Sequence, residues 1–481
     1  MSNLNVSIEE LKCKVTEILE KHCLEMPEGT TTGAFVDQAL HSVAVGGSLF
    51  LPEEVEANGE ISKLETAEQY ERRRQSYQRQ LERALRKTMS VDTTEEMRAG
   101  LYAVLYGEVS PVFRPDPQPK FHFIDLFSGI GGMRLGFQQA GGACVFSSEF
   151  DPAAQKTYRQ NFGEYPFGDI TKVPAEAIPD HDVLLAGFPC QPFSHAGLKK
   201  GIADTRGTLF HNIAEILSEK RPAFAVLENV KGLLSHDGGF TLHTILKRLN
   251  SIGYRCNVPC DVIENGTAEE VRNAAKKMLL KSIDFGVPQN RQRLFIVLWD
   301  KNKRGDDMTF EYPEPLPGVR ASLRVGDILE ADPDESLRIS ERLWAGHQRR
   351  KKMNKRNGKG FGYGLVTPES NYTNTLSARY YKDGSEILVQ DSSKRPRKLS
   401  KREAARLQGF PDDFMPAESN PQAYKQFGNS VSVPVVKAVA EKVAEKIGKT
   451  SSESRRRVPE NSPEPEHFTN FVQKEFGFGH F

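Results

Sequence analysis

Short apolar segments alternate with helical segments between Phe121 and about Asp300, and this alternation constrains the fold more than any other feature. Five segments have the length and composition of buried strands and are bounded by glycine, proline or polar turns: HFIDLF, ACVFSSE, DVLLAGF, FAVLENV and RLFIVLWD. Helical stretches such as 151–161 and 241–249 follow most of them. The pattern predicts an α/β fold with a parallel, doubly wound sheet, whose functional loops lie at the carboxyl ends of the strands.

The chain is long enough for two or three structural units, since it has 481 residues. Its first part is polar and mainly helical in pattern and ends in a proline-rich linker. Past Asp300 the sequence becomes glycine-rich and irregular, then helical again near Ser400, and finally polar. We therefore expect a helical N-terminal extension and linker at 1–118, a main domain at 119–304 completed by 396–447, a smaller domain at 305–395 and a tail at 448–481.

Composition argues against several classes of protein. No stretch approaches the roughly 18 consecutive apolar residues that span a bilayer, and the polar start MSNLNVSIEE lacks the plan of a secretory signal. We therefore expect a cytoplasmic protein with no membrane partner. Six scattered cysteines form neither a disulfide framework nor a paired zinc array, so we expect no metal. A net charge of +1 gives no overall attraction for nucleic acid, so any such affinity has to come from local clusters.

A glycine-rich turn follows the first predicted strand, in DLFSGIGGMRLGF. Gly129 and Gly131 stand there just before a predicted helix, where bare backbone lets a ligand approach closely. A dinucleotide fingerprint would need glycine where Arg134 stands, which disfavours a pyrophosphate binder. Glu149 ends the second strand, where a carboxylate can accept hydrogen bonds from both ribose hydroxyls. Together these features indicate an adenosine ligand without a pyrophosphate, whereas the glycines alone also fit a simple tight turn, less well.

Candidate catalytic side chains follow the next two strands. Cys190 in FPCQPFS can be a nucleophile, whereas a lone cysteine is often an inert core residue; the prolines around it disfavour a buried core strand. Glu228 in ENV ends the fourth strand at the same edge and is either an acid opposite the nucleophile or a structural cap. Arg291 and Arg293 in GVPQNRQR share one face of an extended chain and suit a substrate phosphate or carbonyl, unless they are ordinary surface arginines.

Positive charge is concentrated in HQRRKKMNKRNGKG, which carries seven cations. Such a run is often solvated surface, but the neighbouring glycine-rich turns and the RYYK string favour contact with nucleic acid phosphates. Arg379 is a candidate base reader, since arginine can bridge two acceptors on guanine. The residues that we predict to contact a duplex are Arg349, Arg350, Lys351, Lys352, Arg379, Tyr380 and Lys382.

These motifs, in this order, resemble those of the cytosine-C5 DNA methyltransferases. DLFSGIGG resembles the cofactor loop, GFPCQPFS the catalytic loop, ENV the segment with the catalytic glutamate, and GVPQNRQR the arginine motif. RKLSKREAARLQGFP at 397–411 resembles the helix after the recognition region, with Ser400 where many relatives have threonine, and QAYKQFGNSV at 422–431 the closing cofactor motif. The likeness runs from about 120 to 447, and residues 360–366 with 373–389 resemble the target-recognition domain of Dcm-type enzymes.

The resemblance implies a Rossmann-like methyltransferase domain that uses S-adenosylmethionine, with residues 305–395 as its target-recognition domain. It implies that Cys190 adds to C6 of a cytosine flipped out of the duplex, that Glu228 holds N3, and that Arg291 and Arg293 position the nucleotide. By the same likeness the cofactor contacts are Phe127, Gly129, Gly131, Glu149, Asp169, Ile170, Leu209 and Asn429.

The implied substrate is double-stranded DNA with a short target site, for which CCWGG, CCGG and CCNGG are our candidates. The enzyme would act beside a cognate restriction endonuclease or as a solitary methylase, as a monomer associated with the bacterial nucleoid. Three alternatives stay open. A transfer RNA methyltransferase of the same superfamily would hardly need so long a recognition domain, Arg134 counts against a nucleotide-binding oxidoreductase, and the filled catalytic positions count against a non-catalytic DNA-binding regulator.

Overall fold

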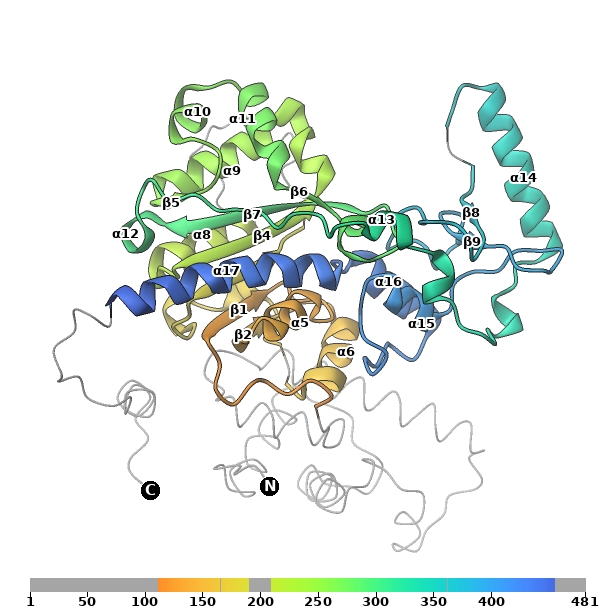
Figure 1. Cartoon of the computed structure of the whole chain (residues 1–481), viewed down its shortest axis with the longest axis horizontal. Helices are drawn as coiled ribbons and strands as arrows, with labels where there is room; N and C mark the ends of the chain where they lie inside the picture. The colour runs from red at the N-terminus through yellow and green to blue at the C-terminus, as the bar shows by residue number, and fades with distance from the viewer. Residues whose placement is uncertain (1–110, 165, 190–208, 361, 455–481) are drawn as a thin grey trace, which may run out of the picture.

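The computed structural model describes residues 111–454 except 165, 190–208 and 361 (Figure 1). Predictions for residues 1–110 and 455–481 lie outside these described residues. The strands are β1 (Phe121–Leu126), β2 (Gly142–Ser148), β3 (Val183–Gly187), β4 (Phe224–Val230), β5 (Tyr254–Arg255), β6 (Leu279–Lys281), β7 (Gln292–Asp300), β8 (Leu365–Val366) and β9 (Leu388–Val389). The five predicted strands are confirmed as β1 to β4 and β7.

The main sheet has seven strands in the order β2-β1-β3-β4-β7-β5, with β6 also paired to β7. Strands β1 to β4 are parallel, as predicted. The sheet departs from the predicted parallel arrangement at β7, which runs antiparallel to β4, β5 and β6. The connection from β6 to β7 covers only residues 282–291, and so short a link joins antiparallel strands because a parallel crossover needs a dozen or more residues.

Helices cover both faces of the sheet, because alternate strand residues point to opposite faces. Ile124 and Leu126 of β1 pack in one core with α8 (Leu209–Lys220) and α9 (Phe240–Ser251). Phe121 and Phe123 pack in a second core with α5 (Gly132–Gln139) and α17 (Val433–Ser454). In Figure 1 α17 runs along the lower side of the sheet and α9 lies above it. Shorter helices complete these layers: α10 (Cys260–Asn265), α11 (Ala268–Ala275), α12 (Lys301–Arg304) and α13 (Val319–Ser322).

The ends of α6 (Pro152–Phe162) follow directly from its sequence. Asp151 caps the helix, because its side chain accepts a hydrogen bond from the Ala153 amide, and proline stands at the first helical position. Gly163 follows with a left-handed backbone, which ends the helix. This confirms the helix predicted at 151–161, and α9 confirms the helix predicted at 241–249.

Residues 325–397 project from the main body, and we call them the peripheral segment (Figure 1). It holds the two-stranded sheet of β8 and β9 and the helix α14 (Glu341–Arg356). The sequence did not predict α14, because His347 is its only buried residue and an exposed helix shows no apolar period. The Ser340 side chain starts the helix by accepting a hydrogen bond from the Leu343 amide.

Two features bear on the domain boundaries predicted at 305 and 448. Phe310 is buried in the core under the main sheet, and the Tyr312 hydroxyl donates to the Phe295 carbonyl at 2.7 Å, so this segment packs with β7. At the other end, α17 continues to Ser454, inside the stretch expected to be a tail. None of the described helices has both the length and the apolar character needed to cross a membrane.

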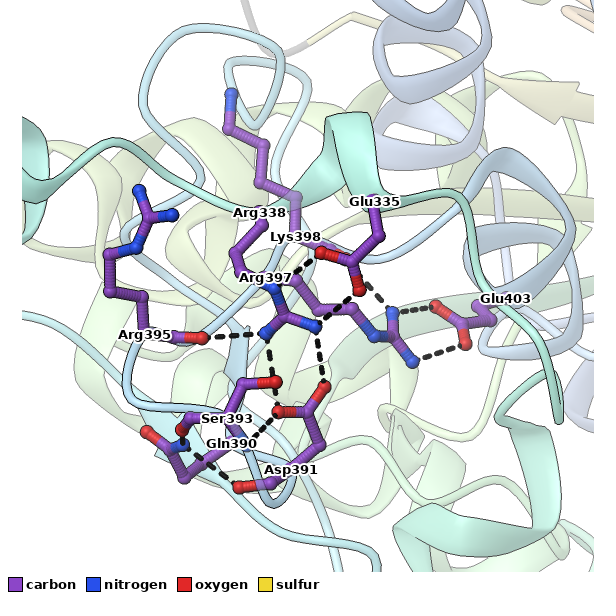
Figure 2. A network of polar contacts seen from close by, with 9 residues as sticks. All are labelled: Glu335, Arg338, Gln390, Asp391, Ser393, Arg395, Arg397, Lys398 and Glu403. Atoms are coloured by element: carbon purple, nitrogen blue, oxygen red, sulfur yellow. Dashed lines mark hydrogen bonds and ion pairs between the residues drawn. The ribbon is translucent and has the colours of Figure 1, made fainter.

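A buried ion pair attaches the peripheral segment to the body (Figure 2). The Glu403 carboxylate, in α15 (Lys401–Arg406), accepts two hydrogen bonds from Arg397, at 2.7 and 2.8 Å. It also accepts from the amides of Glu330 and Ser400, at 2.9 and 2.8 Å. Because both ends of the peripheral segment bond to one wholly buried carboxylate, the segment is fixed at its base.

Candidate active site

A cavity of about 700 Å³ lies at the carboxyl ends of β1, β2, β3 and β4. Parallel strands bring these four ends to one edge of the sheet, which is where open α/β sheets bind ligands. The volume is in the range of pockets that enclose small molecules. One wall comes from the far end of the chain, where α16 (Asn420–Asn429) contributes Lys425, Gln426 and Asn429.

The glycine turn after β1 forms the floor of this cavity. Phe127 and Gly129 both have a left-handed backbone, with φ of 57° and 56°. For Phe127 that conformation is costly, and such strain is typical of binding sites. A β-carbon added at Gly129 would meet no atom within 4 Å, so the backbone there faces open space. The Gly131 backbone caps α5 instead and does not line the cavity.

Glu149 lies beside this turn with its carboxylate held by backbone amides. One oxygen, Oε2, accepts from the Gly129 amide at 2.7 Å, and Oε1 accepts from the Asp151 amide at 2.6 Å. Burial raises the pKa of Glu149, and the two amide hydrogen bonds lower it in part. Each oxygen keeps a lone pair for a further donor, so the carboxylate can bind the two adjacent hydroxyls of a ribose.

Another part of the cavity lining is suited to a flat ring. Asp169 and Ile170 line it, and the Asp169 side chain accepts a hydrogen bond from the Thr171 amide at 3.0 Å. Phe150, next to Glu149, is 75% exposed and also lines the cavity. An apolar ring so exposed is available for stacking. Leu209 and Asn429 line the cavity as well. Glu149, the open glycine backbone and this wall together fit the adenosine part of S-adenosylmethionine.

Asp125 is a cavity-lining residue that sequence reasoning did not single out, although it stands in the DLFSG motif. The residue is fully buried, and neither carboxyl oxygen has a hydrogen-bonding partner with good geometry among the described residues. Burial raises the pKa of Asp125 to about 7, although the charge and backbone of Arg134 oppose the shift. Phe150, Asn229, Lys425 and Ser430 are further lining residues that the sequence patterns did not reveal.

The structure brings Glu228 and Arg293 together in the same cavity. Nε of Arg293 lies 3.0 Å from Oε1 of Glu228, and both residues line the cavity. Burial raises the pKa of Glu228, although the positive charges of Arg293 and Arg291 pull it down. A carboxyl with a raised pKa holds its proton more readily and can donate it to a ring nitrogen.

Cys190 lies outside the described residues, but the strand that leads to it is well fixed. Phe188 and Pro189, directly before it, line the cavity. The Asn229 side-chain amide donates to the Phe188 carbonyl at 2.9 Å, which ties the end of β3 to the end of β4 beside Glu228. Among the residues that the structure describes, no three His, Cys, Asp or Glu side chains gather as a metal site would require.

Two sequence assignments need correction. Arg291 does not line the cavity; it is 1% exposed, and its guanidinium donates to the carbonyls of Leu376, Gly428 and Ser430. Tyr380, expected at a DNA surface, is fully buried, and its hydroxyl donates to the Ile387 carbonyl at 2.7 Å. The period of the string RYYK could not show which of its aromatic rings points inward.

The other residues expected at a DNA surface lie in the peripheral segment, away from the cavity lining. Arg349, Lys351 and Lys352 are exposed on α14, and the Lys351 ammonium lies 4.1 Å from the centre of the Tyr363 ring. Arg350 is partly used within the protein, since it pairs with Asp383 at 3.2 Å. Arg379 and Lys382 are both exposed.

Comparison with known proteins gives one consistent family. The sequence matches the model of the C-5 cytosine-specific DNA methylases over residues 121–445. It is 52% identical to the type II methyltransferase M1.ScrFI of Lactococcus lactis subsp. cremoris, over 72% of this chain and 83% of that protein. It is 54% identical to the type II methyltransferase M.NlaX of Neisseria lactamica, over 67% of this chain and 96% of that protein.

Solved structures give the same fold. The S. pombe Dnmt2 methyltransferase superposes with a TM-score of 0.51 at 22% identity, covering 69% of this chain and 99% of that one. At this level of identity the likeness bears on the fold alone.

Proposed function

Since the chain belongs to the C-5 cytosine-specific DNA methylase family and is thus a DNA methyltransferase dependent on S-adenosylmethionine, we propose that it methylates cytosine within one short duplex site through a covalent bond from Cys190. The Glu228–Arg293 pair is the observation that carries the proposal, because it sets a buried carboxyl with a raised pKa at the cavity edge to which β3 and Cys190 lead.

The target cytosine must leave the base stack, since C5 and C6 are inaccessible inside a duplex. Glu228 then donates its proton toward N3 of the extruded ring, while Arg293 holds the Glu228 carboxyl in place. With N3 protonated, the ring can accept electrons. The Cys190 thiolate adds to C6, and the electron pair of the C5–C6 double bond becomes available at C5.

S-adenosylmethionine would supply the methyl group that C5 takes up and would leave as S-adenosylhomocysteine once its sulfur–methyl bond breaks, with Glu149 and Asp169 as the residues that would hold its adenosine. A base then removes the C5 proton, the C6–sulfur bond breaks, and the cysteine leaves as thiolate. Glu228 recovers its proton from N3. Cys190 and Glu228, which follow from β3 and β4, thus make C5 reactive, and loss of the C5 proton with release of the thiolate restores the aromatic ring.

The peripheral segment is the part that we propose to contact duplex DNA. Its helix α14 projects from the body and carries exposed cations, which suits contact with phosphates. Arg379 is exposed in the same segment and is our candidate for reading a guanine. Because the sequences at 360–366 and 373–389 resemble the target-recognition domain of Dcm-type enzymes, we propose a site such as CCWGG, CCGG or CCNGG. By analogy with the type II relatives, we propose a role beside a restriction endonuclease of the same specificity.

The test is transfer of tritiated methyl groups from S-adenosylmethionine to duplex DNA, to RNA and to no acceptor. We expect label in duplex DNA only; label in RNA alone would overturn the proposal in favour of a transfer RNA enzyme. Bisulfite sequencing of the methylated DNA then identifies the site. Methylation spread over cytosines without a common sequence would contradict site specificity.

A further inference from the structure

A group of buried polar side chains lies just before β7, and the chemistry above does not use it. Gln289 and Gln408 are fully buried and Arg291 is 1% exposed. Polar groups so deep are costly unless they are bonded, and a guanidinium is especially costly. Burial lowers the pKa of Arg291, which expresses the same cost. Apolar side chains in these places would avoid this cost, which indicates that the hydrogen bonds of Gln289, Arg291 and Gln408 have a specific role.

Arg291 bonds to two separate parts of the fold. Nη1 donates to the Leu376 carbonyl at 3.0 Å, and Leu376 belongs to the peripheral segment. Nη2 donates to the Gly428 carbonyl at 3.1 Å and to the Ser430 carbonyl. Gly428 and Ser430 flank Asn429, which lines the cofactor cavity. One side chain therefore holds the peripheral segment and the cavity wall in a fixed relation.

The two parts also touch directly at this point. A β-carbon added at Gly428 would lie 2.3 Å from the backbone carbon of Ser377, so the two backbones are in contact and only glycine fits. Gln289 holds the other side of Leu376, because its Oε1 accepts from the Leu376 amide at 2.8 Å. Nε2 of the same Gln289 side chain donates to the Leu407 carbonyl at 2.7 Å. A shift of the peripheral segment would therefore move the cavity wall with it.

The same stretch of chain continues into the catalytic pair. Arg293 follows Arg291 by two residues, and it contacts Glu228. Burial and the positive charge of Arg293 both lower the pKa of Arg291, and Glu228 opposes them in part. The peripheral segment, the cofactor wall and the catalytic carboxyl are thus all contacted by residues 291–293, at the start of β7.

We propose that Arg291 is a positioning residue that couples DNA binding in the peripheral segment to cofactor binding in the cavity. The proposal rests on the proposed function, because it takes the peripheral segment as the DNA-binding part. Coupling of this kind is reciprocal: duplex strengthens cofactor binding by the same factor as cofactor strengthens duplex binding. Removing the Arg291 side chain should lower this coupling factor more than it lowers the affinity for cofactor in the absence of duplex or for duplex in the absence of cofactor.

The experiment measures binding of S-adenosylhomocysteine, the demethylated cofactor, by calorimetry, with and without a 24-base-pair duplex carrying the site found by bisulfite sequencing. We expect the duplex to tighten binding roughly 10-fold in the wild-type protein, within the usual range of coupling. In Arg291→Met the duplex should change the affinity for S-adenosylhomocysteine by no more than about 2-fold. Arg291→Lys keeps a hydrogen-bond donor and should recover part of the wild-type effect.

Arg221→Met is the matched control. Arg221 also anchors β7, by pairing with Asp300 at the far end of the strand, but it contacts neither the peripheral segment nor the cavity. Its coupling factor should equal that of the wild type. An unchanged factor in Arg291→Met, or no coupling in the wild-type protein, would overturn the proposal. Wild-type protein that fails to methylate duplex DNA would instead refute the proposed function.

Hydrogen exchange on the wild-type protein tests the same coupling without a substitution, and it decides the question if Arg291→Met does not fold. Addition of S-adenosylhomocysteine should slow amide exchange in peptides covering residues 373–389, which do not line the cavity. Peptides covering α11 serve as the reference and should not change. Exchange in 373–389 that ignores the cofactor would rule the coupling out.

Discussion

Arg293 reaches Glu228 diagonally across two antiparallel strands, with Nε 3.0 Å from Oε1. Glu228 lies opposite Phe295 in the register of β4 and β7, so Arg293 is two residues along on the same face of the sheet. This relationship depends on β7 being antiparallel, because a parallel strand in that place would bring its other end to the cavity edge. The departure from a purely parallel sheet therefore creates the catalytic pair.

Replacing Glu228 by glutamine should lower kcat by roughly 10²–10⁴-fold, because an amide cannot give a proton to N3. The raised pKa of Glu228 means that wild-type activity should fall as rising pH removes this proton, and the glutamine variant should lose that limb of the profile. Steady-state methyl transfer across pH provides the measurement. Glu164→Gln is the control, since Glu164 also pairs with a buried arginine, Arg134, but does not line the cavity. Equal losses in both variants would make the Glu228 effect merely structural.

Replacing Cys190 by serine should abolish turnover, because a hydroxyl without a strong base nearby is a far poorer nucleophile than a thiolate. Binding of cofactor and duplex should change little, since the two side chains are similar in size. A duplex with 5-fluorocytosine at the target should trap the wild-type enzyme in a cofactor-dependent complex that survives denaturing electrophoresis, because fluorine cannot leave as a cation. Normal methylation without such a complex would exclude the covalent step.

Substituting alanine for Arg349, Lys351 and Lys352 should weaken binding to all duplexes alike, because phosphate contacts carry no sequence information. The slope of log affinity against log salt should become shallower by about 0.9 for each phosphate that the variant no longer neutralises. Fluorescence anisotropy over a salt series measures this slope. Lys276→Ala with Lys277→Ala, which removes exposed cations from another surface, should keep the wild-type slope. An unchanged slope in the α14 variant would place the DNA elsewhere.

Removing residues 1–110 should leave a folded core that binds cofactor. The family match begins at residue 121, and the described segment after residue 110 already packs on the body, where the Phe113 and Phe162 rings lie 5.9 Å apart. Thermal unfolding with and without S-adenosylhomocysteine measures this. A truncated chain that does not unfold cooperatively would show that the boundary predicted at 118 cuts through a structural unit.

Replacing Asp125 by asparagine should make stability less dependent on pH. The folded pKa of about 7 lies above the ordinary value of 3.8, so the wild-type protein loses stability as pH rises from about 4 through 7. Relative to wild type, the free energy of unfolding of Asp125→Asn should therefore increase by roughly 4 kcal/mol between pH 4 and pH 8. Urea unfolding of cofactor-free protein measures it.

Asp412→Asn provides the opposite case. In the wild-type protein the exposed Asp412 carboxyl accepts a hydrogen bond from Arg406, which lowers the pKa of Asp412. The asparagine variant should therefore lose stability relative to wild type as pH rises. Parallel pH curves for Asp125→Asn and wild type would mean that the Asp125 carboxyl has an ordinary pKa in the folded protein.

Sequence patterns predicted the parallel strands and the places of Glu149 and Glu228 at strand ends, because each strand is a short and mostly buried run bounded by turn residues. Tyr380 and Arg291 show where this reasoning stops. Whether they face solvent depends on residues distant in sequence that no local period encodes, such as Tyr424, which packs on Tyr380, and Gly428, which bonds to Arg291. Helix α14 was missed for the converse reason, since a helix exposed on nearly all sides has no apolar face to reveal it.

Helix α17 packs along α5 on the face of the sheet beneath the cofactor turn. During synthesis on the ribosome, α5 emerges first and waits for its partner while roughly 300 further residues are made, which takes about 15–60 s at ordinary elongation rates. Through that interval Phe137 and the β1 residues Phe121 and Phe123 lack the α17 side chains against which they pack in the folded protein. The nascent chain is thus exposed to aggregation or chaperone capture until α17 has left the exit tunnel and can pack on α5.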